Sequence, residues 1–535
     1  MSGRGTDADA VMTDGPSRSA WRFLWLAAGS AAVLLSLANV IFGNLNQDEG
    51  WYLLAAVNSA CGKAVYRDFM FTQGSVMPSL YGFFLPVWYP YGVLGGRILT
   101  AVIGLSASAL AALTAYRMAP RKFAMHSAFL AFIMIACSPA HSYFTSIPKT
   151  YALAALFFIA GFTPLADSSA FNTRKINVSA AVSGIFLALA ACVRISLGAA
   201  VAVMGIHLLL KHRNREWRFA WLFFGAAAFA VLFIFIGIPA LRYPEQFAFA
   251  QSYHAGRTVP GLLQWLVLRA GFASLVARAY PLLCTTAAVL CIFGVRAGER
   301  KIFNSEGRAA LISFLLVTAV HALAPFPYDD YQTPAMPLLA AVAASALFRI
   351  ADSRGIFFGT RFPASALVCA GIFALASPLL MDWVAVRQDR FWFEMKKKPD
   401  VLMLKDAARE IRGLMPSGGT LFTQDAYLAV EAKCGVPSGM EMGPFCIFPW
   451  ISDDTARRMH VHTPDTLNEL LSKTDSPVCA LSGYSFAVSC PSTEKLPNAT
   501  RKRLFDSVSD KYEIQNAIRD FGQGHTVLTI GKIRE

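Results

Sequence analysis

Ionisable side chains follow the first long apolar segment of the chain, at Asp48, Glu49, Arg67 and Asp68 within NLNQDEGWYLLAAVNSACGKAVYRDFMFTQGSVMP (44–78). Charged groups this close to a hydrocarbon core are costly unless they face water or one another. A carboxylate there can take a proton from a hydroxyl group, and a neighbouring cation can hold an anionic group. The stretch is therefore a candidate for acid–base chemistry.

These residues also have a structural interpretation. Asn46 can cap a helix, with Glu49 three residues later completing a capping box, and acids are favoured in a first helical turn. Arg67 and Asp68 can pair with each other in a structured loop. Capping and function both stay open for Glu49, whereas Asp48 favours a functional role.

The composition is that of a membrane protein. Of 535 residues, 55% are hydrophobic and 15% are charged, and the mean hydropathy is +0.45. A soluble domain carries about 25% charged residues. Apolar runs long enough for spanning helices recur from Phe23 to Met381, which predicts a polytopic helical membrane protein. The polar stretch 1–22 lacks a small-residue cleavage site, so we expect a retained first span and no signal peptide.

The net charge of +14 is explained by orientation in the membrane. Basic residues gather in short loops between apolar segments, where they mark the cytoplasmic side, and this distribution argues against nucleic-acid binding. It predicts about eleven spans, with the N-terminus inside and the C-terminus outside. The spans are expected near 23–43, 93–116, 123–141, 150–166, 177–193, 195–210, 219–240, 276–296, 308–325, 333–350 and 363–381.

Two segments are assigned to the outer face without a span. The apolar stretch 75–92 is interrupted by Pro78, Pro86 and Pro90, which predicts an interfacial or re-entrant helix. Residues 241–275 are expected to form a long outer loop.

The predicted fold is an all-α polytopic membrane domain with a small C-terminal α/β extracytoplasmic domain. Residues 1–22 form a cytoplasmic tail, 23–394 the membrane domain with a first outer loop at 44–92, and 395–535 the α/β domain. Within the last region, DVLMLKDAAREIRGLMPSGG predicts an amphipathic helix, and TLFTQ, SPVCALSGYSFAV and HTVLTIGKI predict strands.

Four of the ten cysteines fall in this outer region, at Cys434, Cys446, Cys479 and Cys490. In an oxidising compartment they could form two disulfides, whose pairing the sequence does not define. The sequence contains neither CxxC nor a His/Cys spacing typical of a metal site.

The predicted topology gathers polar groups from distant parts of the chain on the outer face. Cations and carboxylates there suit a sugar linked to a lipid phosphate, because cations hold the leaving phosphate while a carboxylate takes the proton of the attacking hydroxyl. A second acid is unnecessary, since phosphate is already a good leaving group. The polar groups are Asp48, Glu49, Tyr66, Arg67, Asp68, Gln73, His141, Lys149, Arg194, Asp329, Asp330 and Tyr331.

Several of these groups have simpler alternatives. Lys149 and Arg194 can extend their charged ends to lipid headgroups. Asp329 and Asp330 can belong to a polar turn.

An Asp-Glu pair in the first outer loop, followed by GKAVYRDFMFTQG and SVMPSLYGF, resembles the polytopic glycosyltransferases of the dolichyl-phosphate-mannose protein mannosyltransferase and aminoarabinose transferase type. ACVRIS, PFPYDDYQTPAMPLLA and VPSGMEMGPF also resemble segments of bacterial members. The resemblance implies the GT-C membrane architecture and an inverting transfer from a polyprenyl-phosphate sugar. It also implies a protein, lipid or cell-envelope glycan as acceptor, at the outer face of the bacterial cytoplasmic membrane.

The resemblance assigns roles to individual residues. Asp48 would be the catalytic base, with Glu49 beside it. Apart from the resemblance, the positive charges of Lys149, Arg194 and Arg67 lead us to expect that these residues hold the donor phosphate. Further members of the site would be Tyr66, Asp68, Gln73, His141, Asp329, Asp330 and Tyr331. Several family members carry another acid in the second outer loop, where this chain has SIPKT with Lys149, so no metal or other cofactor is expected.

The alternative is a polytopic transporter of a lipid-linked or small anionic substrate. It predicts charged residues at the bilayer midplane and inverted repeats with broken helices. A third interpretation, a scaffold whose outer domain binds partners, leaves the many spans and the polar first loop without a role.

Overall fold

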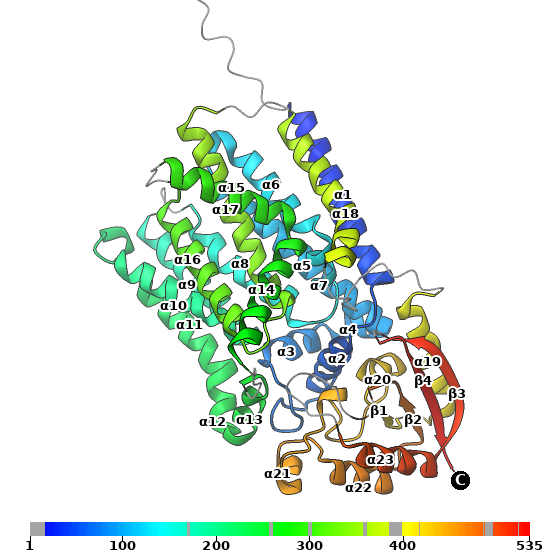
Figure 1. Ribbon diagram of the computed structural model, residues 1–535. Coiled ribbons are helices and arrows are strands. Elements are labelled where there is room, and N and C mark those ends of the chain that lie inside the picture. The colour runs from blue at the N-terminus through cyan, green and yellow to red at the C-terminus, as the bar shows by residue number, and fades with distance from the viewer. Residues whose placement is uncertain are drawn as a thin grey trace, which may run out of the picture.

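The structure is a computed structural model that describes residues 17–167, 172–255, 261–297, 302–356, 361–384, 398–416, 418–484, 486, 496–522 and 524–534. A bundle of long helices carries the C-terminal elements at one end, next to the shorter helices α2 (Gln47–Ala60) and α3 (Val76–Phe83) (Figure 1). We call this the domain end of the bundle.

Helices occupy all of the predicted spans. Seven helical stretches among the described residues are long and apolar enough to cross a membrane, and four shorter apolar helices accompany them. The protein is therefore a multi-pass membrane protein, as predicted. The bundle helices are α1 (Arg18–Phe42), α5 (Gly92–Met118), α6 (Ala124–Ala136), α8 (Thr150–Phe162), α9 (Thr173–Val193), α10 (Gly198–Leu210), α11 (Ala220–Leu232), α15 (Pro281–Ala297), α16 (Ser305–Leu323), α17 (Met336–Ser353) and α18 (Phe362–Val384).

The described residues of the predicted outer loop 241–275 are largely helical, which corrects the expectation of a loop. The segment contains α13 (Pro244–Ala255) and most of α14 (Leu262–Ala279). By length and composition α14 could span a membrane, but its contacts lie at the ends of other helices. Arg269 donates to the carbonyls of Leu323 and Ala324, and Ala279 accepts from Ser138. Helix α14 therefore runs across the domain end.

The stretch 75–92 folds as short helices, as its prolines predict. After α3 come α4 (Leu85–Trp88) and a 3-10 turn, η1 (Tyr89–Tyr91), each with a proline in its first two positions. Proline has no amide hydrogen to donate, so it is tolerated where a helix begins and interrupts one that would continue.

Helix α2 begins with the predicted capping box. The Asn46 side chain accepts from the Asp48 amide at 3.0 Å, and Glu49 Oε1 accepts from the Asn46 amide at 2.8 Å. One face of α2 packs against α20 (Ala426–Ala432) at Gly50, where a Cβ atom would lie 2.3 Å from the Tyr427 nitrogen. Only glycine allows this approach.

The C-terminal elements form the expected α/β unit. Its sheet has the order β1-β2-β4-β3, with β1 and β2 parallel and the other pairs antiparallel. The strands are β1 (Leu421–Thr423), β2 (Val478–Leu481), β3 (Tyr512–Phe521) and β4 (Thr526–Ile533). The helices are α19 (Asp400–Leu414), α20, α21 (Asp453–Arg458), α22 (Pro464–Lys473) and α23 (Asn498–Lys511). The predicted helix and three predicted strands correspond to α19, β1, β2 and β4. Strand β3 was not predicted, because its residues are mostly exposed and show no apolar alternation.

Two buried carboxylates tie this unit to the bundle. Asp400 accepts from the Leu45 amide, and Glu431 accepts from the Val93 amide, each at 2.8 Å. The predicted domain boundary at 394/395 lies outside the described residues, as do most of the predicted cytoplasmic tail and Cys490.

The three described cysteines of this unit, Cys434, Cys446 and Cys479, are free thiols. None of the disulfides that could join these three to one another is therefore formed in the structure.

Glu441 is expected to make the stability of the C-terminal unit depend on pH. The side chain is 5% exposed and accepts from the Gly439 amide, and burial raises its pKa from the ordinary 4.5 to about 7. In the unfolded chain it ionises at the ordinary pKa. Its stabilising contribution is therefore complete below pH 4.5 and is lost as the pH rises through 7, by up to about 3 kcal/mol.

Thermal unfolding of wild type and Glu441→Gln at pH 5 and pH 8 checks this prediction. The variant should gain stability relative to wild type at pH 8 and match it most closely at pH 5. The exposed Glu513→Gln is the control. An equal difference between Glu441→Gln and wild type at both pH values would contradict the prediction.

Candidate active site

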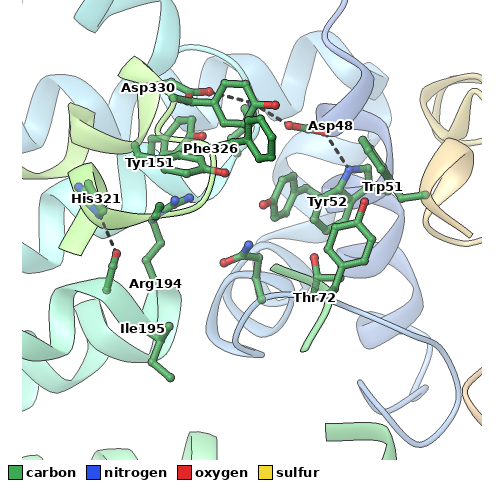
Figure 2. A pocket seen from close by; sticks show the side chains of 18 of the residues that line it. Asp48, Trp51, Tyr52, Thr72, Tyr151, Arg194, Ile195, His321, Phe326 and Asp330 are labelled. Atoms are coloured by element: carbon green, nitrogen blue, oxygen red, sulfur yellow. Dashed lines mark hydrogen bonds and ion pairs between the residues drawn. The ribbon is translucent and has the colours of Figure 1, made fainter. Parts of the chain in front are cut away.

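A cavity of about 280 Å³ opens at the domain end of the bundle. Asp48, Trp51 and Tyr52 of α2 form one wall, and Arg194, Ile195 and His321 lie opposite (Figure 2). Aromatic side chains surround the polar groups. They are Trp51, Tyr52, Tyr151, Tyr253, Phe326, Tyr328, Tyr331 and Phe445.

An ammonium group joins two carboxylates in this cavity. Lys149, at the start of α8, places Nζ 2.8 Å from Asp48 Oδ2 and 3.5 Å from Asp330 Oδ2. Asp330 belongs to η7 (Asp329–Ala335), so the three charges come from three separate elements. The Lys149 and Asp330 side chains are 8% and 4% exposed, whereas that of Asp48 is 22% exposed. Burial is tolerable because the charges are paired, and Asp48 is the carboxylate most open to a ligand.

Arg194 supplies the second cation. It follows α9, and its guanidinium carbon lies 4.7 Å and 5.1 Å from the ring centroids of Tyr151 and Tyr331. One hydrogen bond, from Nη1 to Thr150 Oγ1 at 3.0 Å, fixes it further. Its buried Nε has no hydrogen-bond partner in the described part of the chain. Two aromatic faces thus orient a guanidinium that still has donors to offer.

A hydrogen-bonded chain reaches the cavity beside Arg194. Ser196, in the turn η4 (Ile195–Leu197), lies 2.8 Å from His321 Nε2, and His321 Nδ1 lies 3.0 Å from Gln332 Oε1. Gln332 Nε2 in turn donates to Thr318 at 2.6 Å. The chain links η4, α16 and η7, and Ser196 and His321 line the cavity.

Six predicted site residues line the cavity. They are Asp48, Gln73, Lys149, Arg194, Asp330 and Tyr331. They come from the segments predicted to be the first and second outer loops, from the α9–α10 hinge and from the turn before α17.

Glu49 is not among the lining residues. Its side chain is completely buried and pairs with Arg97 of α5, through Oε2 to Nε and Oε1 to Nη2, both at 2.7 Å. Arg97 also donates to the carbonyls of Val40, Gly43 and Asn44. The expected catalytic role of Glu49 therefore gives way to a structural one, in which it caps α2 and joins α2 to α5.

Arg67 and Asp68 pair with each other at 2.6 Å, and their side chains are 51% and 31% exposed. The Arg67 guanidinium holds the pKa of the Asp68 carboxyl below its ordinary value. Neither residue lines the cavity, so the expected contact of Arg67 with the donor phosphate is not seen in this geometry.

The remaining predicted residues lie behind the cavity wall. Tyr66 is buried and donates to the Gln73 carbonyl at 2.7 Å, which supports the loop that brings Gln73 to the cavity. His141 is buried against Tyr280, and Asp329 is buried beside Asp330 in η7.

Sequence analysis missed Arg97, Ser196, His321 and most of the aromatic lining, with Tyr331 as the exception. Arg97 and His321 carried a signal, because polar or ionisable residues within predicted spans are functional candidates by default. The aromatic residues carried none, since apolar side chains occur throughout the bundle.

The cavity does not fit a metal ion bridging two acids. Among the described residues no group of three or more His, Cys, Asp or Glu side chains could hold a metal. The position between Asp48 and Asp330 is filled by the Lys149 ammonium, which would repel a divalent cation.

No protein-family model matches the chain, and no match is found among curated proteins. Among solved structures, the chain is similar to ArnT from Cupriavidus metallidurans bound to undecaprenyl phosphate, with a TM-score of 0.60 and 13% identity over 96% of this chain and 98% of ArnT. Its apo state gives a TM-score of 0.58 at 14% identity, with the same coverage. The chain therefore has the GT-C fold of membrane glycosyltransferases along nearly its whole described length.

Proposed function

We propose that the protein transfers a sugar from a polyprenyl-phosphate donor to an acceptor, with inversion, at the outer face of a bacterial cytoplasmic membrane. The observation that carries the proposal is the cavity itself, in which one accessible carboxylate, Asp48, faces two cations, Lys149 and Arg194. The acceptor is a protein, a lipid or a cell-envelope glycan.

Lys149 and Arg194 would hold the donor phosphate. Both lie in a cavity largely walled by aromatic groups, where charge-assisted hydrogen bonds to phosphate oxygens are stronger than in water. They would also stabilise the negative charge that grows on the phosphate as the sugar leaves. The undecaprenyl phosphate bound to ArnT, which has the same fold, supports a polyprenyl phosphate as the carrier.

Asp48 would act as the general base. It would take the proton of an acceptor hydroxyl while that oxygen forms a bond to the anomeric carbon, and the bond from that carbon to the phosphate oxygen would break with its electron pair. A single displacement of this kind inverts the anomeric configuration. Lys149 Nζ pairs with Asp48 Oδ2 at 2.8 Å. A bound phosphate would compete for the ammonium and leave the Asp48 carboxylate free to accept a proton from the acceptor hydroxyl.

The domain end would face the outside of the cell. A second hollow is formed by residues of the loops that the sequence predicts to be cytoplasmic. Its lining includes four cations, Arg117, Arg121, Lys211 and Arg349. Basic residues favour the cytoplasmic side, which supports an outward-facing cavity.

Release of polyprenyl phosphate by the purified protein tests the proposal. The protein is supplied with a panel of polyprenyl-phosphate sugars and a membrane extract as acceptor. Release that depends on one sugar and on the extract supports the proposal. If folded protein released no polyprenyl phosphate with any donor, the result would favour the transporter alternative.

Replacing Arg194 by lysine is expected to weaken binding of undecaprenyl phosphate by ~10-fold or more. Lysine keeps the charge but cannot stack between Tyr151 and Tyr331 or present a planar set of donors, and a hydrogen bond to a charged group is worth about 1.5–3 kcal/mol. Titration of the lipid into each variant measures the effect. Arg278→Lys, on α14 and outside the cavity lining, is the control. Equal affinities for Arg194→Lys and wild type would contradict the prediction.

A further inference from the structure

The chain of hydrogen bonds that ends at Ser196 defines where its protons lie. The Thr318 hydroxyl donates to the Phe314 carbonyl at 2.8 Å, so its oxygen is left to accept from Gln332 Nε2. The other atom of that amide, Oε1, therefore faces His321 and can only accept. His321 Nδ1 must carry a hydrogen to make this contact at 3.0 Å.

A neutral imidazole with its proton on Nδ1 has a lone pair on Nε2. The Ser196 hydroxyl therefore donates the 2.8 Å hydrogen bond to His321 Nε2. In this state the Ser196 hydrogen points away from the cavity, and a phosphate would meet only its oxygen lone pairs. Protonation of His321 would reverse the bond, because Nε2–H would then donate and the hydroxyl could turn to the cavity.

The charged side chains that line the cavity balance one another. Its ionised lining groups are two carboxylates, Asp48 and Asp330, and two cations, Lys149 and Arg194. A phosphate monoester has a second pKa near 6 and so brings close to two negative charges at neutral pH. His321 is the one histidine among the described lining residues. By taking up a proton it could add a positive charge to the cavity.

The groups that face His321 come from two elements besides its own helix. The imidazole is 2% exposed, and burial opposes a charge on it, as does Arg194 beside η4, whereas Asp330 of η7 favours a charge. The Tyr331 ring, also of η7, lies 6.2 Å from the imidazole. A phosphate held by Arg194 would cancel the charge of the guanidinium and add its own negative charge beside the imidazole, and both changes favour the imidazolium.

We propose that His321 is a positioning residue that takes up one proton from solvent when polyprenyl phosphate binds. Its Nε2–H then donates to Ser196, and the Ser196 hydroxyl donates to a phosphate oxygen beside Arg194. The inference rests on the proposed function, because it requires a lipid phosphate in this cavity. It adds a proton-linked step to binding that the roles of Asp48, Lys149 and Arg194 do not contain.

Calorimetric titration of undecaprenyl phosphate at pH 8, in two buffers with different heats of ionisation, counts the protons taken up. Wild type should take up more protons per bound lipid than His321→Gln, and its affinity should fall more steeply as the pH rises from 7.5 to 8.5. The control is His126→Gln, a buried histidine of α6 that lies among Trp21, Phe123 and Phe348 and should behave as wild type.

Gln332→Glu is a second variant for the same titration, and it tests the inference if His321→Gln does not fold. A carboxylate on Nδ1–H would hold His321 protonated before the ligand arrives, so proton uptake should fall while lipid binding persists. Equal uptake in wild type and in the folded variants would overturn the inference and leave the proposed function standing. No binding of the lipid by wild type would overturn both.

Discussion

Asp48→Asn is expected to reduce sugar transfer by at least ~10²-fold while the protein stays folded. General bases contribute typically about 10²–10⁴-fold, and an amide cannot take the acceptor proton. The substitution keeps the shape of the side chain. Asp48 Oδ1 accepts from Trp51 Nε1 at 3.3 Å, and the amide oxygen of asparagine can do the same. Initial rates of polyprenyl-phosphate release at saturating donor measure the effect.

Asp68→Asn is the matched control. Asp68 lies in the same loop, but it is partly exposed, pairs with Arg67 and is absent from the cavity lining. It should keep nearly full activity. Equal rates for Asp48→Asn and Asp68→Asn, with equal folding, would remove Asp48 from the base role.

Arg97→Met is expected to destabilise the protein by about 3–5 kcal/mol, the usual cost of leaving one partner of a buried pair unpaired. Both side chains of the Arg97–Glu49 pair are 0% exposed, and Arg97 also satisfies the backbone carbonyls of Val40, Gly43 and Asn44. Little folded protein should be recovered. Thermal unfolding in detergent, followed by intrinsic fluorescence, measures the loss.

Two companion variants separate the ion pair from a general effect of losing an arginine. Combining Arg97→Met with Glu49→Gln removes both charges and should recover part of the lost stability. Arg67→Met removes an exposed charge and should change the unfolding temperature little. If Arg97→Met unfolded at the same temperature as wild type, the pair would not hold α2 against α5.

Hydropathy predicted the bundle because hydrocarbon imposes a length and a composition on every spanning helix. By length and composition α14 would also qualify as a span, although the sequence prediction placed most of it in an outer loop. Its position follows from Arg269 and Ser138, whose partners are remote in sequence. Strand β3 escaped prediction for the opposite reason, because its exposed face carries no apolar pattern.

The candidate site was predictable where topology alone gathers residues. Asp48, Lys149, Arg194 and Asp330 come from segments assigned to one membrane face, and the structure brings them to one cavity. Glu49 was ambiguous because a capping acid and a catalytic acid occupy the same position of a first helical turn. Only the position of Arg97, on a helix whose neighbours the sequence does not reveal, favours the structural role.

The contact between Gly50 and α20 also sets an order of events during biosynthesis. Helix α2, which carries Asp48, emerges early, but the backbone that it packs against at Tyr427 belongs to one of the last elements to be synthesised. At roughly 5–20 residues per second the interval is on the order of 20–75 s. Until then the cavity lacks part of its support, so a ribosome-bound chain halted before α20 would be inserted in the membrane and yet inactive.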